Sequence, residues 1–310
     1  MYDTGAKLSS TVDGFVGVRH DAPMLYGLGS AIGFGLADLF GAVSTRRIGV
    51  PMTLFVIQVV SLIALTLLLL TPVPGNDPLS ASAGTLAALA VAGLFGTVSF
   101  FSFYRALQLG PVAVVSPVFA SYAAVAVLLS VVVGGERLST TAWVGVALTI
   151  AGVALASARN EDDGSGTRSW GGIPYALVAT FAWGTASYLI GKYAKETGWF
   201  LPIYAVRTVE FVGVGAVMVL LRARGTLFSV PRGTSLAIPS ASSLADASAI
   251  ALFARASETG SISIAAAVSA TFPLVVIAGG VALFHERPSP RQWAGVLAAV
   301  AGLIVLGLGQ

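Results

Sequence analysis

The sequence lacks cysteine and has only two histidines among its 310 residues. Without cysteine the chain cannot form disulfides, thiolate metal sites or a cysteine nucleophile. The histidines, His20 and His285, are far apart in the chain, and no HExxH motif is present. Zinc binding and histidine-based catalysis therefore lack their usual ligands. We expect no metal site, no cofactor and no catalytic residue.

Charged residues are also scarce. They make up 10% of the chain, whereas a typical soluble domain has about 25%. Hydrophobic residues make up 56% and the mean hydropathy is +0.87. A chain of this length cannot bury so much apolar surface in one core. We therefore predict an integral membrane protein whose main surroundings are the lipid bilayer. Lysine and arginine are scattered without a basic run, so no nucleic-acid partner is indicated.

Long apolar runs predict an all-α protein with ten transmembrane helices, since a helix needs about 20 apolar residues to cross a bilayer. The predicted spans are Met24–Ser44, Met52–Leu70, Gly84–Leu107, Val112–Val133, Ala142–Ala158, Gly171–Lys192, Leu201–Leu221, Leu236–Ser257, Ile262–Phe284 and Pro290–Leu308. Residues 1–23 contain no such run, and we interpret them as a polar N-terminal tail. Residues 159–169 form a polar connecting loop, which separates a first five-helix repeat, 24–158, from a second, 170–310.

The two halves repeat one another in sequence. A shift of 150 residues aligns Glu136 with Glu286, and a shift of 149 aligns Gly35 with Gly184. Because five is an odd number, the second half must enter the membrane from the opposite side, so the repeats are predicted to be inverted. Inverted repeats are typical of secondary transporters, whose binding site lies near the midplane. The two glutamates are interpreted as polar stops at the membrane surface rather than as catalytic groups.

A helix start follows each glutamate. Ser139 and Ser289 stand where an N-cap residue is expected, and Pro290 suits the first position of a helix.

Three segments carry a resemblance to a known family. They are FAWGTASYLIGK (Phe181–Lys192), GGERLS and FHERPS, and the last two precede Trp-x-Gly helices. In these segments the chain resembles the ten-helix EamA-type branch of the drug/metabolite transporter superfamily. The first half departs from that pattern, with Phe34 in place of Trp183, and with Ala123 where the second half has the helix-interrupting Pro273. The resemblance implies alternating-access export or exchange of a small polar or amphipathic metabolite through a central cavity. A membrane scaffold or receptor with a transporter-derived fold is an alternative. An integral membrane enzyme is disfavoured by the missing motifs.

Four ionisable residues fall inside predicted spans: Asp38, Arg207, Glu210 and Asp246. A charge at the centre of a span costs about 2.5–3.5 kcal/mol on insertion scales, so each should face a partner or water. Arg207 and Glu210 share a helix face at spacing i, i+3 and could pair. Alternatively, Arg207 could bind a substrate carboxylate or phosphate. Asp246 and Asp38 are candidate proton carriers, because burial disfavours the charged form of a carboxyl; the alternative is a hydrogen bond between helices.

Other residues complete the predicted substrate cavity: Gln58, Tyr122, Trp183 and Tyr188. Aromatic residues in membrane helices more often serve as packing or interface anchors, so this assignment is a hypothesis. The fifth and tenth spans, Ala142–Ala158 and Pro290–Leu308, have no mid-span polar group and are expected outside the cavity. They suit lipid contact or dimer packing, which leaves a homodimer open.

Ten spans place both termini on the same side of the membrane. The distribution of lysine and arginine between the two sides favours external termini, whereas the resemblance implies cytoplasmic termini. We follow the resemblance and expect a multi-pass protein of a prokaryotic plasma membrane.

Overall fold

In a computed structural model, the structure describes residues 5–71, 81–109, 115, 118–156, 171–226, 236–284 and 290–308. These residues form helices and turns, and no strand occurs among them. The helices are α1 (Gly5–Ile48), α2 (Val50–Leu68), α3 (Ala83–Leu109), α5 (Tyr122–Val132), α6 (Thr140–Ala156), α7 (Ile173–Thr197), α8 (Phe200–Ala223), α9 (Ala237–Thr259), α10 (Ile262–Ser269), α11 (Phe272–Phe284) and α12 (Pro290–Leu308).

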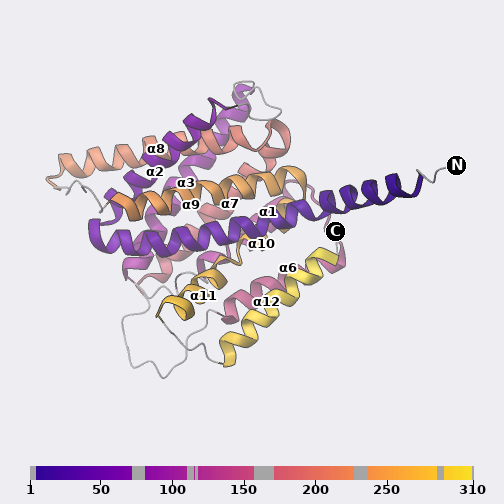
Figure 1. The fold of residues 1–310 in the computed structure, drawn as a ribbon. Coiled ribbons are helices and arrows are strands. Elements are labelled where there is room, and N and C mark those ends of the chain that lie inside the picture. The colour runs from indigo at the N-terminus through magenta and orange to yellow at the C-terminus, as the bar shows by residue number, and fades with distance from the viewer. Residues whose placement is uncertain are drawn as a thin grey trace.

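Six of the described helices, α1, α2, α3, α7, α8 and α9, are long and apolar enough to cross a membrane. Four shorter apolar stretches accompany them: Val118–Val132, Thr140–Leu155, Ile262–Val276 and Trp293–Gly302. These segments fall on the ten spans predicted from sequence. One boundary differs: α1 begins at Gly5, so the backbone of the predicted polar tail is also helical, while the apolar part of α1 begins at Ala22. In Figure 1 this first part of α1 extends beyond the bundle.

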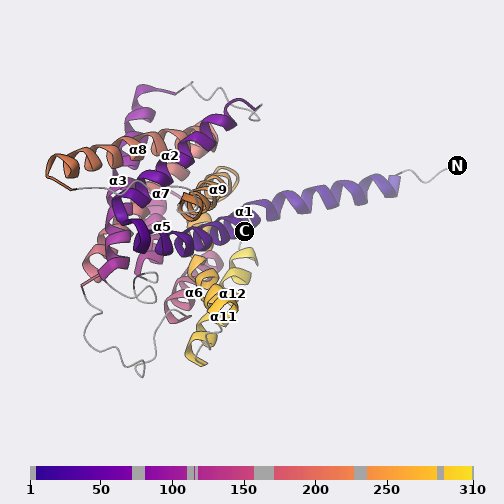
Figure 2. The same ribbon diagram turned by 60° about the vertical axis from the view of Figure 1, so that its left-hand side comes forward.

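The main packing contacts join the two halves of the chain. Helix α1 lies along α9, and α3 lies along α7. Helix α2 packs against α8, and α6 packs against α12. Figures 1 and 2 show α6 and α12 as a pair at one side of the bundle. Neither half therefore forms a separate core, and the interior of the molecule lies between them.

Glycines at matching positions bring the halves together closely. Gly35 on α1 packs against Val275 on α11, and Gly184 on α7 packs against Val125 on α5. A methyl group added to either glycine would lie 2.5 Å from the valine Cβ, which is far inside van der Waals contact. The two contacts correspond under the 149- and 150-residue shifts found in the sequence. Substitution at either position would push α1 or α7 away from the helix that it contacts.

The pair α6 and α12 meets in the same reciprocal manner. Gly152 on α6 faces Ala299 on α12, and Gly302 on α12 faces Thr149 on α6. In both cases an added methyl group would overlap the backbone of the neighbouring helix. Small residues of this kind let membrane helices approach closely.

Both halves contain a helix break at equivalent positions. Helices α10 and α11 are separated at Ala270–Thr271, just before Pro273, and a turn at Ser121 precedes α5. Ser121 Oγ donates a hydrogen bond to the Val118 carbonyl at 2.5 Å, and Thr271 Oγ1 donates to the Val268 carbonyl at 2.7 Å. The backbone N–H groups of Ser121 and Thr271 donate to the same two carbonyls, so each break is closed by the same pair of hydrogen bonds. The first half can therefore break at this place without a proline at the position equivalent to Pro273.

Glu136 follows α5 and contacts the other half of the chain. Its carboxylate accepts hydrogen bonds from the backbone N–H of Ile262 at 3.0 Å and of Ser263 at 3.2 Å, and from Ser263 Oγ at 2.6 Å. Lys195 Nζ lies 3.7 Å away. Burial alone would raise the pKa of Glu136, but the hydrogen bonds from Ser263 and Ser261 and the Lys195 charge together hold that pKa below its usual value. The predicted polar stop thus caps the N-terminus of α10.

The helix start after Glu136 is capped as predicted, since Ser139 Oγ accepts the backbone N–H of Ala142 at 3.1 Å. Glu286 and Ser289 lie outside the described residues.

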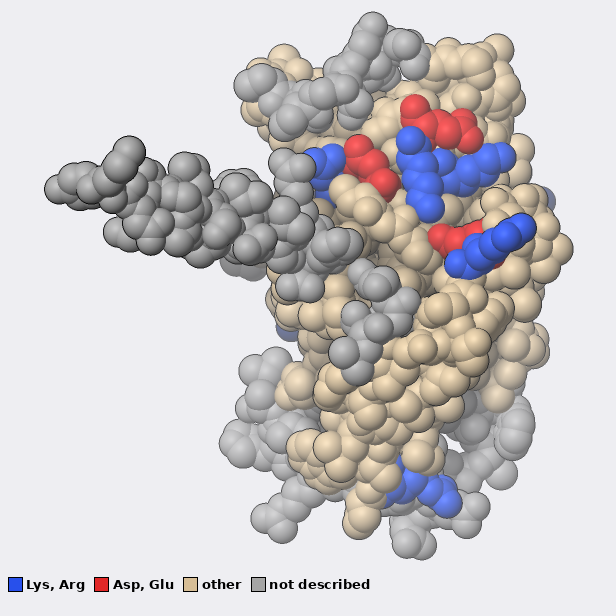
Figure 3. All heavy atoms as spheres, turned by 90° about the vertical axis from the view of Figure 1, so that its right-hand side faces the viewer, with Lys and Arg blue, Asp and Glu red and all other residues tan. Residues whose placement is uncertain are grey.

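Figure 3 views the end of the bundle from which α1 extends, and it shows acidic and basic side chains beside one another there. Ion pairs at the ends of α7 and α9 include Lys195–Glu136 and Arg255–Glu258, the latter at 2.7 Å.

Candidate functional site

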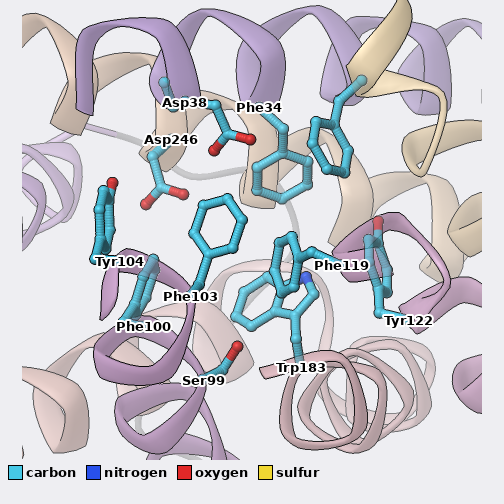
Figure 4. A pocket seen from close by; sticks show the side chains of 12 residues that line it. Phe34, Asp38, Ser99, Phe100, Phe103, Tyr104, Phe119, Tyr122, Trp183 and Asp246 are labelled. Carbon is cyan, nitrogen blue, oxygen red and sulfur yellow. The ribbon is translucent and has the colours of Figure 1, made fainter. Parts of the chain in front are cut away.

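A narrow cavity lies between the two halves, with a volume of about 30 Å³. Its lining comes from α1, α3, α5, α7, α9 and α11 and from the short segment before α5 (Figure 4). The lining residues are Phe34, Ala37, Asp38, Ser99, Phe100, Phe103, Tyr104, Phe119, Tyr122, Trp183, Asp246 and Phe272. Helices α6 and α12 contribute none of them, as expected for the fifth and tenth spans.

Aromatic rings form most of the cavity wall. Trp183 on α7 is central to them, with ring centroids 6.2 Å from Phe34, 5.8 Å from Phe100 and 6.5 Å from Tyr122. Its contacts with Phe34 and Tyr122 are edge-to-face, an arrangement that aromatic pairs favour. The wall therefore joins rings from both halves and offers a ligand several aromatic surfaces.

Two carboxyl groups interrupt this aromatic wall. Asp38 on α1 and Asp246 on α9 lie next to each other at one side of the cavity (Figure 4). Asp38 Oδ2 is buried and has no hydrogen-bond partner within the described ranges. Asp246, in contrast, accepts a hydrogen bond from the Arg207 guanidinium. Among the described residues, therefore, one carboxyl of the cavity has a cationic partner and the other does not.

A network of polar side chains lies behind the cavity and neutralises part of its charge. Arg207 on α8 is fully buried; it donates from Nη2 to Asp246 and from Nη1 to Glu210 Oε2 at 3.0 Å. Gln58 Nε2 on α2 donates to the same Glu210 oxygen at 3.3 Å. Gly96 on α3 lies directly against Glu210, and a side chain there would overlap its carboxylate. The predicted i, i+3 pair of Arg207 and Glu210 is confirmed.

Serines on α9 position Asp246 relative to the first half. Ser242 Oγ donates to the Ala37 carbonyl at 2.8 Å, and Ser243 Oγ donates to the Ile57 carbonyl at 2.7 Å. These two hydrogen bonds join α9 to α1 and α2, which fixes Asp246 beside the cavity.

The residues predicted for the cavity fall into three groups. Four of them line it: Asp38, Tyr122, Trp183 and Asp246. Gln58, Arg207 and Glu210 belong to the network behind it. Tyr188 is buried but is not among the lining residues; its ring lies near Gly134, at the end of α5.

Phe34, Phe100, Phe103 and Phe119 also line the cavity and were not selected from the sequence. The sequence repeat contains a signal for part of this wall. Phe34 matches Trp183 under the 149-residue shift, and Tyr122 matches Phe272 under the 150-residue shift. Positions that are aromatic in both halves could therefore have been ranked first. Within the described residues no group of three His, Cys, Asp or Glu side chains could hold a metal ion.

Comparison with known families matches residues 22–158 and residues 170–308 to the EamA-like transporter family. The chain belongs to this family. Family membership makes it a multi-pass membrane transporter and points away from an enzyme. A protein of Archaeoglobus fulgidus described as an uncharacterized transporter is 26% identical over 205 residues, which are 66% of this chain and 69% of that relative.

A protein of known crystal structure has the same fold as this EamA family member. The TM-score is 0.72 at 20% sequence identity, over 93% of this chain and 97% of the other. At this identity the likeness concerns the fold alone. The cavity and its chemistry must be argued from the residues of this chain.

Proposed function

We propose that the protein is a secondary transporter that moves a small polar or amphipathic metabolite through the cavity by alternating access, in export or exchange. The observation that carries this proposal is the cavity itself, which lies between the halves and places two carboxyl groups among aromatic rings. Its volume of about 30 Å³ has room for only a few water molecules, since one water needs roughly 10–15 Å³ of such space. A metabolite therefore needs the halves to move apart, as alternating access requires.

The directions of the helices support inverted repeats. Lys195 near the end of α7 and Ile262 just after α9 both contact Glu136, so α7 and α9 end at the same face. Pro23 on α1 lies against Gly260 at this face. The apolar part of α1 thus begins where its counterpart α7 ends. Equivalent helices that run in opposite directions are what inverted repeats require, and the matched glycine contacts support a two-fold relation.

The N-terminal end of α1 and the C-terminal end of α12 lie toward the same face of the bundle in Figure 1, which supports termini on one side of the membrane. We propose that this side is cytoplasmic and that the membrane is the cell membrane. A reporter fused to the C-terminus should then be active only in the cytoplasm. Activity confined to the periplasm would contradict this orientation.

Asp38 is our preferred proton carrier, ahead of Asp246. The charge of Asp246 is balanced by Arg207, whereas Asp38 Oδ2 has no partner in the described part of the chain. A proton on that oxygen would remove an uncompensated charge from the cavity. The titratable groups that line the cavity with it are Asp246 on α9, Tyr104 on α3 and Tyr122 on α5. Proton occupancy of Asp38 would change the affinity for substrate, and substrate would change the affinity for the proton.

Uptake into liposomes that contain the purified protein tests this function. A panel of labelled metabolites is supplied with and without a pH gradient, and empty liposomes give the background. We expect saturable uptake of at least one compound and its accumulation against a gradient when protons are driven across. Asp38→Asn should abolish accumulation while exchange down a concentration gradient persists. Glu196→Gln, which changes an exposed carboxyl at the end of α7, is the matched control.

The outcomes separate the alternatives. Full proton-driven accumulation by Asp38→Asn would pass the role of carrier to Asp246, and its persistence in both single variants would place the carrier at another group. Saturable flux of the wild type without accumulation in a pH gradient would make the protein a facilitator. Binding of a compound without any flux would favour a receptor or scaffold. Chemical conversion of a compound would favour an enzyme.

A further inference from the structure

The charged groups that face the cavity all have one sign. Asp38 and Asp246 line it, whereas Arg207 is fully buried and is not among the lining residues. Both terminal nitrogens of the Arg207 guanidinium already donate to carboxylates. The guanidinium keeps other N–H groups, including Nε–H, which has no partner among the described residues, but it does not line the cavity, where an anionic substrate would meet the two carboxyl groups instead. The hypothesis that Arg207 binds a substrate carboxylate or phosphate is therefore disfavoured by the contacts.

The charge balance of the site leaves room for a cation. Arg207 contributes +1, and Asp38, Glu210 and Asp246 contribute −3 when ionised, which leaves −2. If Asp38 takes up a proton the sum is still −1. A monovalent cation beside ionised Asp38 would reduce the charge to the same −1 that a proton gives, which a neutral or anionic ligand cannot do.

The uncharged part of the wall also favours a cation. Eight of the twelve lining residues are aromatic, and the faces of aromatic rings attract cations, most strongly in desolvated sites. The Arg207 guanidinium lies 5.4 Å from the centre of the Phe100 ring, so one ring of this wall already has a cation close to it. Groups of aromatic rings with a nearby carboxylate are suited to ammonium ions, whose weakly hydrated alkyl groups can contact the rings.

We propose that the cavity binds an organic ammonium ion with an apolar or aromatic body, either a protonated amine or a quaternary ammonium compound. The ammonium group would lie between Asp38 and Asp246, and the body would contact Trp183 and Phe100. This inference rests on the proposed transport function and names its class of substrate.

Equilibrium binding to the purified protein tests the inference with three probes of similar size. These are benzyltrimethylammonium, phenylacetate and benzyl alcohol, which are cationic, anionic and neutral. We expect benzyltrimethylammonium to bind at least about tenfold more tightly than the other two. Asp38→Asn should weaken its binding about tenfold or more, since one ionic contact is lost. Asp38→Glu should restore part of the affinity, and Glu196→Gln should bind like the wild type.

A second variant separates the aromatic contribution. Trp183→Leu should weaken binding of benzyltrimethylammonium more than Trp183→Phe, because only phenylalanine keeps a ring face toward the ligand. Thermal unfolding of each variant shows whether the fold is intact, and Asp38→Asn leaves the Arg207 contacts unchanged. Equal binding of the three probes would overturn the proposal, and so would undiminished affinity of folded Asp38→Asn.

Flux measurements distinguish this inference from the function on which it rests. Saturable uptake of an anionic or neutral compound, together with no binding of the ammonium probe, would overturn the substrate class and leave transport standing. Binding of the ammonium probe without flux of any ammonium compound would support the site and contradict transport.

Discussion

Replacement of Arg207 by glutamine should strongly destabilise the folded protein. The guanidinium bridges Glu210 and Asp246, whose side chains are 0% and 9% exposed, so Arg207→Gln leaves two carboxylates without their cation. Removal of one partner from a buried ion pair costs about 3–5 kcal/mol. Water can screen little of this loss because the groups are buried. At about 2–4 °C per kcal/mol, the melting temperature should fall by roughly 6–20 °C.

The assay is thermal unfolding in detergent micelles, followed by the loss of the monodisperse peak in gel filtration. A triple variant with Arg207→Gln, Glu210→Gln and Asp246→Asn removes all three charges of the network together, so it should melt well above the single variant. Replacement of buried ion networks by neutral groups is often tolerated. The account would be refuted by an Arg207→Gln protein that melts like the wild type, or by a triple variant that melts no higher than the single one.

Three other substitutions test individual contacts. At pH values above 4.5, the ordinary pKa of glutamate, Glu136→Gln should lower the melting temperature. The pKa of Glu136 is lowered in the folded protein, so the difference in melting temperature between variant and wild type should disappear only as the pH falls through that lowered value. Gly96→Ala should displace the Glu210 carboxylate and lower the melting temperature, whereas Gly215→Ala, with nothing within 4 Å, should not. Gly152→Val should separate α6 from α12 and destabilise the protein, and ligand binding by the fraction that remains folded should be unchanged; Gly215→Val is its control.

Much of the helix plan could be predicted because the bilayer restricts it. A crossing helix needs about 20 apolar residues, and its backbone groups must be satisfied internally, so apolar runs and their breaks locate the spans. The pairing of Arg207 with Glu210 followed from i, i+3 spacing on one helix. The contact of Arg207 with Asp246 did not, since it depends on how α8 and α9 pack.

The aromatic wall was harder to predict for a physical reason. In a soluble protein the alternation of polar and apolar residues shows which face of a helix is buried. In a membrane helix the lipid-facing side is apolar as well, so Phe100 and Phe103 cannot be told from lipid-facing residues by pattern. Glu136 was correctly placed at a helix end, but its contact with α10 required knowledge of the packing between the halves.

The central claim is that the cavity opens alternately to the two sides of the membrane, and the absence of natural cysteine allows a direct measurement. Ala37→Cys places one thiol in the cavity wall, and Leu297→Cys places one on the exposed surface of α12. Each is treated with a membrane-impermeant thiol reagent from either side of sealed vesicles. The account predicts that Ala37→Cys reacts from both sides, more slowly when benzyltrimethylammonium is present, and that Leu297→Cys reacts from neither. Reaction of Ala37→Cys from one side only under every condition would contradict it.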